Sequence, residues 1–324
     1  MNTRGWIAND EERASGLIMK NNESIPFYWR MISLIGHQLP LKSGLMRIAT
    51  HPLMRRIKPT LSHPFDVRLR NGIRVTVGPD DLNGLILSLF GTEDPKVVGI
   101  CSTLVQSCDL LLDIGANYGS VGLLCIKQMN PKGRIHLFEP NPRLARMLEQ
   151  VAEDQLNGEV VVHPIALADH DGSIGLSFPD GNNSGSASII IDQTTHSTKT
   201  VEVPVRSTRS YLSNIVDNAT FGVKLDIEGA ERFVLPWIVC QPNLRFVVFE
   251  CTHFDSDFDW FTPIKKAGLL LFAIERKFLT VRLSPISTPS DAAPFHDLVA
   301  IRPRHEMSSS RTIGLRQLAK LVIS

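Results

Sequence analysis

Four acidic residues stand where apolar runs of the sequence end, and they are the first candidates for chemistry. Asp113 and Glu139 close the first two of these runs, and Asp226 and Glu250 close two later ones. Carboxylates accept hydrogen bonds from hydroxyl groups, take up protons and bind cations. If the runs are strands of a parallel sheet, their carboxyl ends open onto one crevice. We therefore expect these four side chains to meet at one edge of a sheet.

A glycine-rich turn organises this edge. The stretch from Asp109 to Gly119 reads Asp-Leu-Leu-Leu-Asp-Ile-Gly-Ala-Asn-Tyr-Gly, and it predicts a strand, a tight turn and a helix from Ser120 to Met129. The free N–H groups at such a helix start form a ligand pocket. A dinucleotide fingerprint needs glycine where Asn117 stands, and the sequence has no Gly-x-x-x-x-Gly-Lys-Ser/Thr run. A phosphate-free ligand therefore fits this turn better.

Glu139 indicates the kind of ligand, because it follows Gly119 by twenty positions at the end of the second predicted strand. An acid at that place can accept both hydroxyls of a ribose. A nucleoside with a cationic or zwitterionic tail suits such a site, and S-adenosylmethionine is the common one. The alternative is purely structural: Asp113 and Ser120 cap the helix, the glycines form the turn, and Glu139 is a solvated strand end.

Asp226 is best placed to meet an acceptor hydroxyl or the amino group of such a cofactor. Methyl transfer is an in-line displacement, in which the protein aligns two reactants and manages one proton. Lys224, Asp226 and Glu228 are spaced by two and share one side if the strand extends that far. His253 follows the fifth strand and suits a general base, although a lone histidine is often structural. Asp226, Glu228 and His253 are the predicted catalytic residues.

A metal ion is an open alternative at the same place. Glu228 and Glu231, with Glu250, offer hard oxygen ligands for Mg²⁺ or Ca²⁺. Against this, Glu231 falls in the first turn of a predicted helix, where the helix dipole alone favours an acid. No residue is assigned to a metal.

The composition is that of an ordinary globular protein without strong charge bias. Of 324 residues, 43% are hydrophobic and 21% are charged, and the formal net charge is +1. Near-neutrality argues against a nucleic-acid partner and leaves a small molecule or a glycan as the expected substrate. The five cysteines lack metal-binding spacing and are typical of reduced thiols in a cytoplasmic protein. Neither a signal-peptide core nor an apolar stretch of the roughly 18 residues that span a membrane is found, so no export is expected.

Residues 1–60 are expected to form a helical N-terminal extension. A basic stretch is preceded by apolar residues at near-helical spacing, namely Phe27, Tyr28, Trp29, Ile32 and Ile35. The simplest interpretation is a helix packed on the core with its cations in solvent. The sharper interpretations are a lid near the substrate entrance, an arm that forms a homo-oligomer, and a helix on a membrane surface.

Five motifs follow one another along the chain. They are Asp-Ile-Gly-Ala-Asn-Tyr-Gly at 113–119, Phe-Glu-Pro-Asn-Pro at 138–142, Ala-Leu-Ala-Asp-His-Asp-Gly at 166–172, Lys-Leu-Asp-Ile-Glu-Gly-Ala-Glu at 224–231 and Phe-Glu-Cys-Thr-His at 249–253. Together they resemble the FkbM-type S-adenosylmethionine-dependent methyltransferases over about residues 85 to 302. The resemblance implies an α/β class I methyltransferase (Rossmann-like) fold: a mostly parallel seven-stranded sheet with an antiparallel final strand and helices on both faces. It also implies O-methylation of a sugar or a small natural product.

The predicted elements divide the chain, and the sequence assigns cofactor contacts. Residues 61–105 are expected to form a hairpin around the tight-turn dipeptide Asn71-Gly72 and a helix that leads into the methyltransferase domain at 106–305. The tail at 306–324 is expected to contain a short helix that begins at Thr312. Within that domain apolar runs alternate with helical stretches, which also favours a mainly parallel sheet. The predicted contacts to S-adenosylmethionine are Asp113, Gly115, Ala116, Asn117, Tyr118, Gly119, Glu139, Pro140, Asn141, Ala166, Leu167 and Asp226.

Two other functions stay open. A binding protein that kept the cofactor pocket and lost turnover would have a similar sequence, although the intact acids at 113, 139 and 226 speak against it. An NAD(P)-dependent oxidoreductase is disfavoured by Asn117. Arg206 to Tyr211 departs from the family's more usual Thr-Leu-Asp, which leaves the substrate open.

Overall fold

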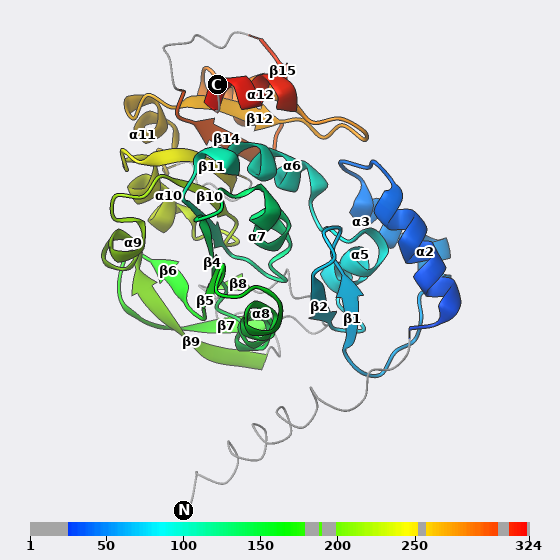
Figure 1. Cartoon of the computed structure of the whole chain (residues 1–324). Coiled ribbons are helices and arrows are strands. Elements are labelled where there is room, and N and C mark those ends of the chain that lie inside the picture. The colour runs from blue at the N-terminus through cyan, green and yellow to red at the C-terminus, as the bar shows by residue number, and fades with distance from the viewer. Residues whose placement is uncertain (1–24, 179–187, 190–198, 252–256, 304–310, 323–324) are drawn as a thin grey trace, which may run out of the picture.

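A mixed sheet of nine strands forms the centre of the molecule (Figure 1). The structure is a computed structural model that describes residues 25–178, 188–189, 199–251, 257–303 and 311–322. The strands from β5 to β11 run parallel to one another, and β14 lies antiparallel between β11 and β12. Their order across the sheet is β15 (Ile313–Gly314), β13 (Arg282–Pro285), β12 (Leu270–Ile274), β14 (Asp297–Ile301), β11 (Leu244–Glu250), β10 (Phe221–Leu225), β3 (Leu110–Ile114), β4 (Arg134–Phe138) and β5 (Val160–His163).

The central sheet has nine strands, so the prediction of a seven-stranded sheet is wrong. The seven strands from β5 to β12 include the expected antiparallel strand, but β13 pairs with the outer edge of β12 and β15 pairs with β13. Pairing satisfies backbone groups that an edge strand leaves open. In β13 Leu283 is buried while Arg282 is exposed, which is the alternation of a half-buried strand. Because Ile313 and Gly314 form β15, the tail helix α12 (Leu315–Val322) begins three residues after the predicted start at Thr312.

Helices cover both faces of the sheet, as predicted (Figure 1). Side chains alternate along β3, so that Leu111 packs with one group of helices while Leu110 and Leu112 pack with the other. Every residue of β3 is buried, as a strand covered on both faces requires. The first group is α6 (Pro95–Leu104), α7 (Ser120–Cys125), α8 (Pro142–Gln155) and α12, and the second is α9 (Thr208–Val216), α10 (Glu231–Val239) and α11 (Phe261–Lys266).

Two smaller sheets flank the core. The predicted hairpin is present as β1 (Phe65–Arg68) and β2 (Arg74–Val77). The other sheet has the order β6 (Ala166–Ala168), β9 (Lys199–Ser207), β7 (Gly172–Phe178) and β8 (Ser188–Ile189). The first strand of this second sheet follows β5 closely, which brings Ala166 and Leu167 to the edge of the core where the acids were predicted to meet.

Side-chain caps fix the starts of three helices that approach this edge. Asp81, Asp94 and Asn141 each accept hydrogen bonds from backbone N–H groups in the first turn of α5 (Leu82–Phe90), α6 and α8. Pro95 and Pro142 occupy the first helical position of α6 and α8, where a missing N–H has no cost. The starting residue of each helix is therefore set by its own sequence.

Two N-terminal helices, α2 (Phe27–Gln38) and α3 (Leu45–Ala49), lie beside α5 on the outer side of the molecule (Figure 1), and α4 (Pro52–Ile57) contacts α3. Trp29 is fully buried, and its Nε1 donates to the Ser88 hydroxyl at 2.7 Å. Gly36 lies so close to the carbonyl of Leu89 that a larger side chain would overlap it. Among the helices of the described ranges, none combines the length and apolarity that crossing a bilayer requires.

Candidate active site

A cavity of about 1070 Å³ opens at the carboxyl ends of β3, β4, β10 and β11. Glu139, Asp226 and Glu250 line it, so three of the four acids predicted to meet do so. The structure also brings several other predicted site residues into the lining, which are Gly115, Ala116, Asn117, Pro140, Ala166, Leu167 and Glu228. His253 lies outside the described residues.

Four predicted cofactor contacts do not line the cavity and support its wall instead. Tyr118 is fully buried, and its hydroxyl donates to Asp81 Oδ2 at 2.7 Å. Gly119 has a φ of 70° and packs its backbone against α8. Asn141 caps α8. Asp113 lies beneath the turn, fully buried, where its Oδ2 accepts from the N–H of Gly122 at 2.8 Å.

Glu139 holds the glycine-rich turn and the second strand end together. Its Oε2 accepts from the N–H of Asn117 at 2.7 Å, and its Oε1 accepts from the N–H of Asn141 at 2.9 Å. A carboxylate has about four lone-pair positions, so both oxygens can still accept from a ligand. Burial raises the pKa of Glu139 to about 7, although the two backbone N–H groups oppose this rise.

Gly115 allows the tips of β3 and β10 to approach each other. Its φ is 76°, and a methyl group on its Cα would overlap the carbonyl oxygen of Asp226. The N–H of Asp226 donates to the Ile114 carbonyl at 3.0 Å, which fixes this approach. A position with both constraints accepts only glycine.

We therefore expect Gly115→Ala to weaken cofactor binding at least about tenfold, because the turn must shift away from Asp226. Isothermal titration with S-adenosylhomocysteine measures this loss. Gly158→Ala is the matched control, since Gly158 has a φ of 82° and nothing within 4 Å of the added methyl group. Gly158→Ala should therefore cost only the strain of a non-glycine residue at positive φ, about 1–2 kcal/mol, without a steric overlap. Equal binding by the two variants would show that the close approach at Gly115 is dispensable.

Lys224, two residues before Asp226 on β10, links the strand tips. It pairs with Asp113 across neighbouring strands, with Nζ 3.4 Å from Asp113 Oδ1 and 3.5 Å from Asp226 Oδ2. Nζ also donates to the Gly115 carbonyl at 2.5 Å. Burial lowers the pKa of Lys224, but the carboxylates of Asp113 and Asp226 outweigh it and hold the pKa above its ordinary value. Lys224 is therefore a charged, fixed part of the site.

The model of one protein family, described as the Methyltransferase FkbM domain, matches residues 113–283. The match begins at the first strand tip and covers more than half of the chain. The chain belongs to the FkbM methyltransferase family. The resemblance inferred from the five motifs is thus confirmed, and with it the assignment as an S-adenosylmethionine-dependent methyltransferase.

Solved structures resemble this FkbM methyltransferase at low sequence identity. Methyltransferase FkbM from Methylobacillus flagellatus KT is 16% identical to this chain, with a TM-score of 0.36. The match covers 60% of this chain and 44% of that protein's chain. A SAM-dependent O-methyltransferase from Thermotoga maritima is 10% identical over 76% of this chain and 80% of its own, with a TM-score of 0.37. An O-methyltransferase from Bacillus cereus in complex with SAH is 10% identical over 64% and 80%, with a TM-score of 0.33. No curated protein matches the sequence.

Glu93 is a cavity residue of this FkbM methyltransferase that the motifs do not reveal. It lines the cavity, and its Oε2 accepts from the Ser120 hydroxyl at 2.8 Å. Its other oxygen is buried without a hydrogen-bond partner in the part of the chain that the structure describes. Burial raises the pKa of Glu93 to about 8, although the hydrogen bond from Ser120 opposes the rise. In the sequence Glu93 stands in a polar turn, Gly91-Thr-Glu-Asp-Pro95, which carries no periodic signal.

The raised pKa of Glu93 predicts how Glu93→Gln changes stability with pH. Because the folded-state pKa exceeds the unfolded value, the wild type loses stability as pH rises from about 4.5 to about 8. The neutral amide removes this loss. We expect the variant to match the wild type near pH 4 and to exceed its free energy of unfolding by about 1–3 kcal/mol at pH 8.5. Urea unfolding at both pH values tests this, with the exposed Glu149→Gln on α8 as control.

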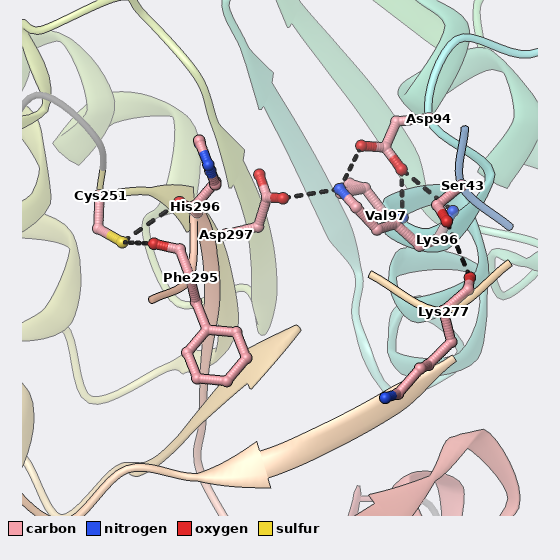
Figure 2. Close-up of polar contacts among 9 residues, drawn as sticks. All are labelled: Ser43, Asp94, Lys96, Val97, Cys251, Lys277, Phe295, His296 and Asp297. Atoms are coloured by element: carbon pink, nitrogen blue, oxygen red, sulfur yellow. Dashed lines mark hydrogen bonds and ion pairs between the residues drawn. The ribbon is translucent and has the colours of Figure 1, made fainter. Parts of the chain in front are cut away.

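A second ionic cluster borders the cavity (Figure 2). Lys96 Nζ lies 2.6 Å from Asp94 Oδ2 and 2.7 Å from Asp297 Oδ2, and all three residues line the cavity. The Ser43 hydroxyl donates to the Lys277 carbonyl at 3.0 Å. The ion pairs of Lys96 join α6 to β14, and the hydrogen bond of Ser43 joins the α2–α3 connection to the loop after β12. Segments distant in sequence thus form one rim of the cavity.

The open alternative of a metal site gains no support. Strand β10 ends at Leu225 and Glu228 has a φ of 52°, so the condition under which Lys224, Asp226 and Glu228 would share one side of a strand is not met. Glu231 is buried, and its two oxygens accept from the N–H groups of Ile227 and Gly229, each at 2.9 Å. It thus closes the turn. Within the described ranges, no group of three or more His, Cys, Asp or Glu residues could hold a metal ion.

Proposed function

We propose that this protein transfers a methyl group from S-adenosylmethionine to a hydroxyl oxygen of a sugar, a glycan or another small natural product. The observation that carries the proposal is the cavity at the strand tips, which joins the family's glycine-rich turn to Glu139, Asp226 and Glu93. Its volume of about 1070 Å³ exceeds that of a usual small-ligand pocket, so a cofactor and an acceptor both have room.

The lining residues suit the parts of the cofactor. Glu139 has acceptor capacity for the two ribose hydroxyls, beside the backbone of Gly115 and Asn117. Ala166 and Leu167 give an apolar wall near β5 for the adenine ring. The buried, unpaired oxygen of Glu93 can accept from the cofactor's ammonium group, and the ammonium would in turn favour the ionised form of Glu93.

Bound S-adenosylmethionine supplies a methyl group that its sulfonium already activates. The protein must then align the acceptor oxygen and receive the proton of the hydroxyl. Asp226 and Glu228 line the cavity near the end of β10, and the side chain of Asp226 is 44% exposed, so it is open to an acceptor. We propose Asp226 as the base, with Glu228 and His253 as the other candidates.

Two experiments test the proposal in sequence. Calorimetric titration with S-adenosylmethionine, S-adenosylhomocysteine and NAD should show binding of the first two alone. Incubation with S-adenosylmethionine that carries a tritiated methyl group and a host extract should then label a small molecule or a glycan, whose labelled position mass spectrometry identifies. Binding of NAD alone would contradict the cofactor assignment. Cofactor binding without any transfer would favour a binding protein, and label on protein or nucleic acid would contradict the acceptor class.

A further inference from the structure

Helix α2 exposes a row of large apolar side chains. Phe27, Tyr28, Met31, Leu34 and Ile35 are 43–77% exposed. Their spacing places them on one side of the helix. The row lies away from the face that packs on α5. A solvent-facing apolar row of this length is characteristic of a binding surface.

Helices α3 and α4, which follow α2 in the chain, add two further exposed apolar side chains. Met46 and Leu53 are each 55% exposed. Within the described ranges, eight of the eleven exposed large hydrophobic residues fall between residues 27 and 53. We call residues 27–58 the N-terminal surface. Its concentration of exposed apolar side chains distinguishes it from the other residues that the structure describes.

The charge of this segment has one sign. From Ile25 to Phe65 the sequence contains six lysine and arginine residues and no aspartate or glutamate. The whole chain has a formal net charge of only +1, so the remainder is net negative. The exposed cations include Arg30 on α2, Arg47 on α3, and Arg55 and Arg56 on α4. Exposed apolar and exposed basic side chains thus occur together on α2, α3 and α4.

The packing of α2 holds its apolar row outward. Trp29 is buried and bonded to Ser88, and Gly36 crosses the Leu89 carbonyl at close range. Rotation of the helix would expose Trp29 and place a larger residue at the crossing. The exposed row is therefore a consequence of a well-packed opposite face.

We propose that the N-terminal surface docks the protein on a bilayer that contains anionic lipids. The apolar side chains would enter the boundary between headgroups and acyl chains, while the arginines meet the anionic headgroups. A second copy of the chain fits less well, because a symmetric contact would bring two cationic segments without an acid against each other. The cavity is lined in part by Lys42–Ile48, so docking would place its rim beside the membrane. This inference is independent of the methyl acceptor.

Vesicle co-sedimentation of the full 324-residue chain tests the proposal. We expect it to sediment with vesicles of phosphatidylcholine mixed with phosphatidylglycerol, and much less with phosphatidylcholine alone. High salt should weaken the interaction, because it screens the arginines. Phe27→Ser/Leu34→Ser and Arg55→Gln/Arg56→Gln should each lower the affinity about tenfold or more.

Matched substitutions elsewhere distinguish binding through this surface from nonspecific binding to vesicles. Phe233→Ser removes an exposed aromatic residue on α10, and Arg146→Gln/Arg209→Gln removes two exposed cations on α8 and α9. Both should bind vesicles like the wild type. Circular dichroism melts confirm that each variant folds. The proposal is overturned if the wild type does not bind anionic vesicles, or if the surface variants bind as well as the controls. It is also overturned if light scattering shows a dimer that Phe27→Ser/Leu34→Ser dissociates while vesicles stay unbound.

Discussion

Lys224→Met is expected to lower the free energy of unfolding by about 3–5 kcal/mol, because it leaves a buried carboxylate without its cation. Asp113 is fully buried, and its Oδ1 has no hydrogen-bond partner within the described residues. The ammonium group of Lys224, 3.4 Å away, is therefore the balancing charge. Methionine keeps most of the side-chain volume and removes the charge, together with the hydrogen bond that Lys224 donates to the Gly115 carbonyl. Urea unfolding followed by circular dichroism at neutral pH measures the loss.

The loss should also depend on pH. Burial already raises the pKa of Asp113 above its ordinary value, and Lys224 opposes this rise. Without Lys224 the folded-state pKa rises further. A carboxyl with a raised folded-state pKa loses stability as pH increases above its unfolded value. The difference between Lys224→Met and wild type should therefore be small near pH 4 and grow toward neutral pH.

Two further variants make this prediction specific. Adding Asp113→Asn to Lys224→Met should recover most of the lost stability, because the amide oxygen still accepts from Gly122 without a charge. Lys96→Met is the matched control at another buried lysine. The side chains of its partners, Asp94 and Asp297, are 36% and 20% exposed, so water can solvate them. Lys96→Met should therefore lower the free energy of unfolding less than Lys224→Met does. Full stability of Lys224→Met at neutral pH would contradict the charged pair.

The fold was predictable where periodicity and turn chemistry agreed. β3 is a short apolar run closed by a glycine turn, and Asn71-Gly72 marked the β1–β2 hairpin. β13 and β15 were missed because strands of four and two residues carry too little alternation to stand out. Their pairing depends on the open edge of β12, which is a long-range property. Sequence alone therefore predicted the parallel core better than the edge.

The site was predictable to the extent that a strand end places a side chain. Glu139, Asp226 and Glu250 meet because parallel strands end at one edge. Asp113 also follows an apolar run, but its side chain is fully buried, where it accepts from the N–H of Gly122 and pairs with Lys224, which lines the cavity in its place. Glu93 enters from a turn before α6 that no pattern connects to β3. Residues contributed by distant turns need tertiary structure, whereas those at strand tips do not.

Asp226→Asn is expected to lower the rate of methyl transfer about 10²–10⁴-fold while changing cofactor affinity far less, if Asp226 receives the acceptor's proton. The carboxamide has nearly the same shape and cannot take a proton at this position. Asp226 is partly exposed, and its N–H bond to Ile114 belongs to the backbone, so the substitution should preserve the fold. Single-turnover kinetics with the labelled acceptor measure the chemical step apart from product release.

Glu228→Gln is the matched comparison, because Glu228 lines the same cavity two residues further along. If Asp226 is the base, Glu228→Gln should retain most of the transfer rate, and both variants should bind S-adenosylhomocysteine like the wild type. A large loss of binding in Asp226→Asn would instead identify Asp226 as a contact to the cofactor's ammonium group. If Asp226→Asn transfers the methyl group at the wild-type rate, Asp226 is not the base, and Glu228 and His253 are the remaining candidates. Comparing the loss of transfer rate with the loss of binding thus shows whether Asp226, at the end of β10, acts as the base or as a contact to the cofactor.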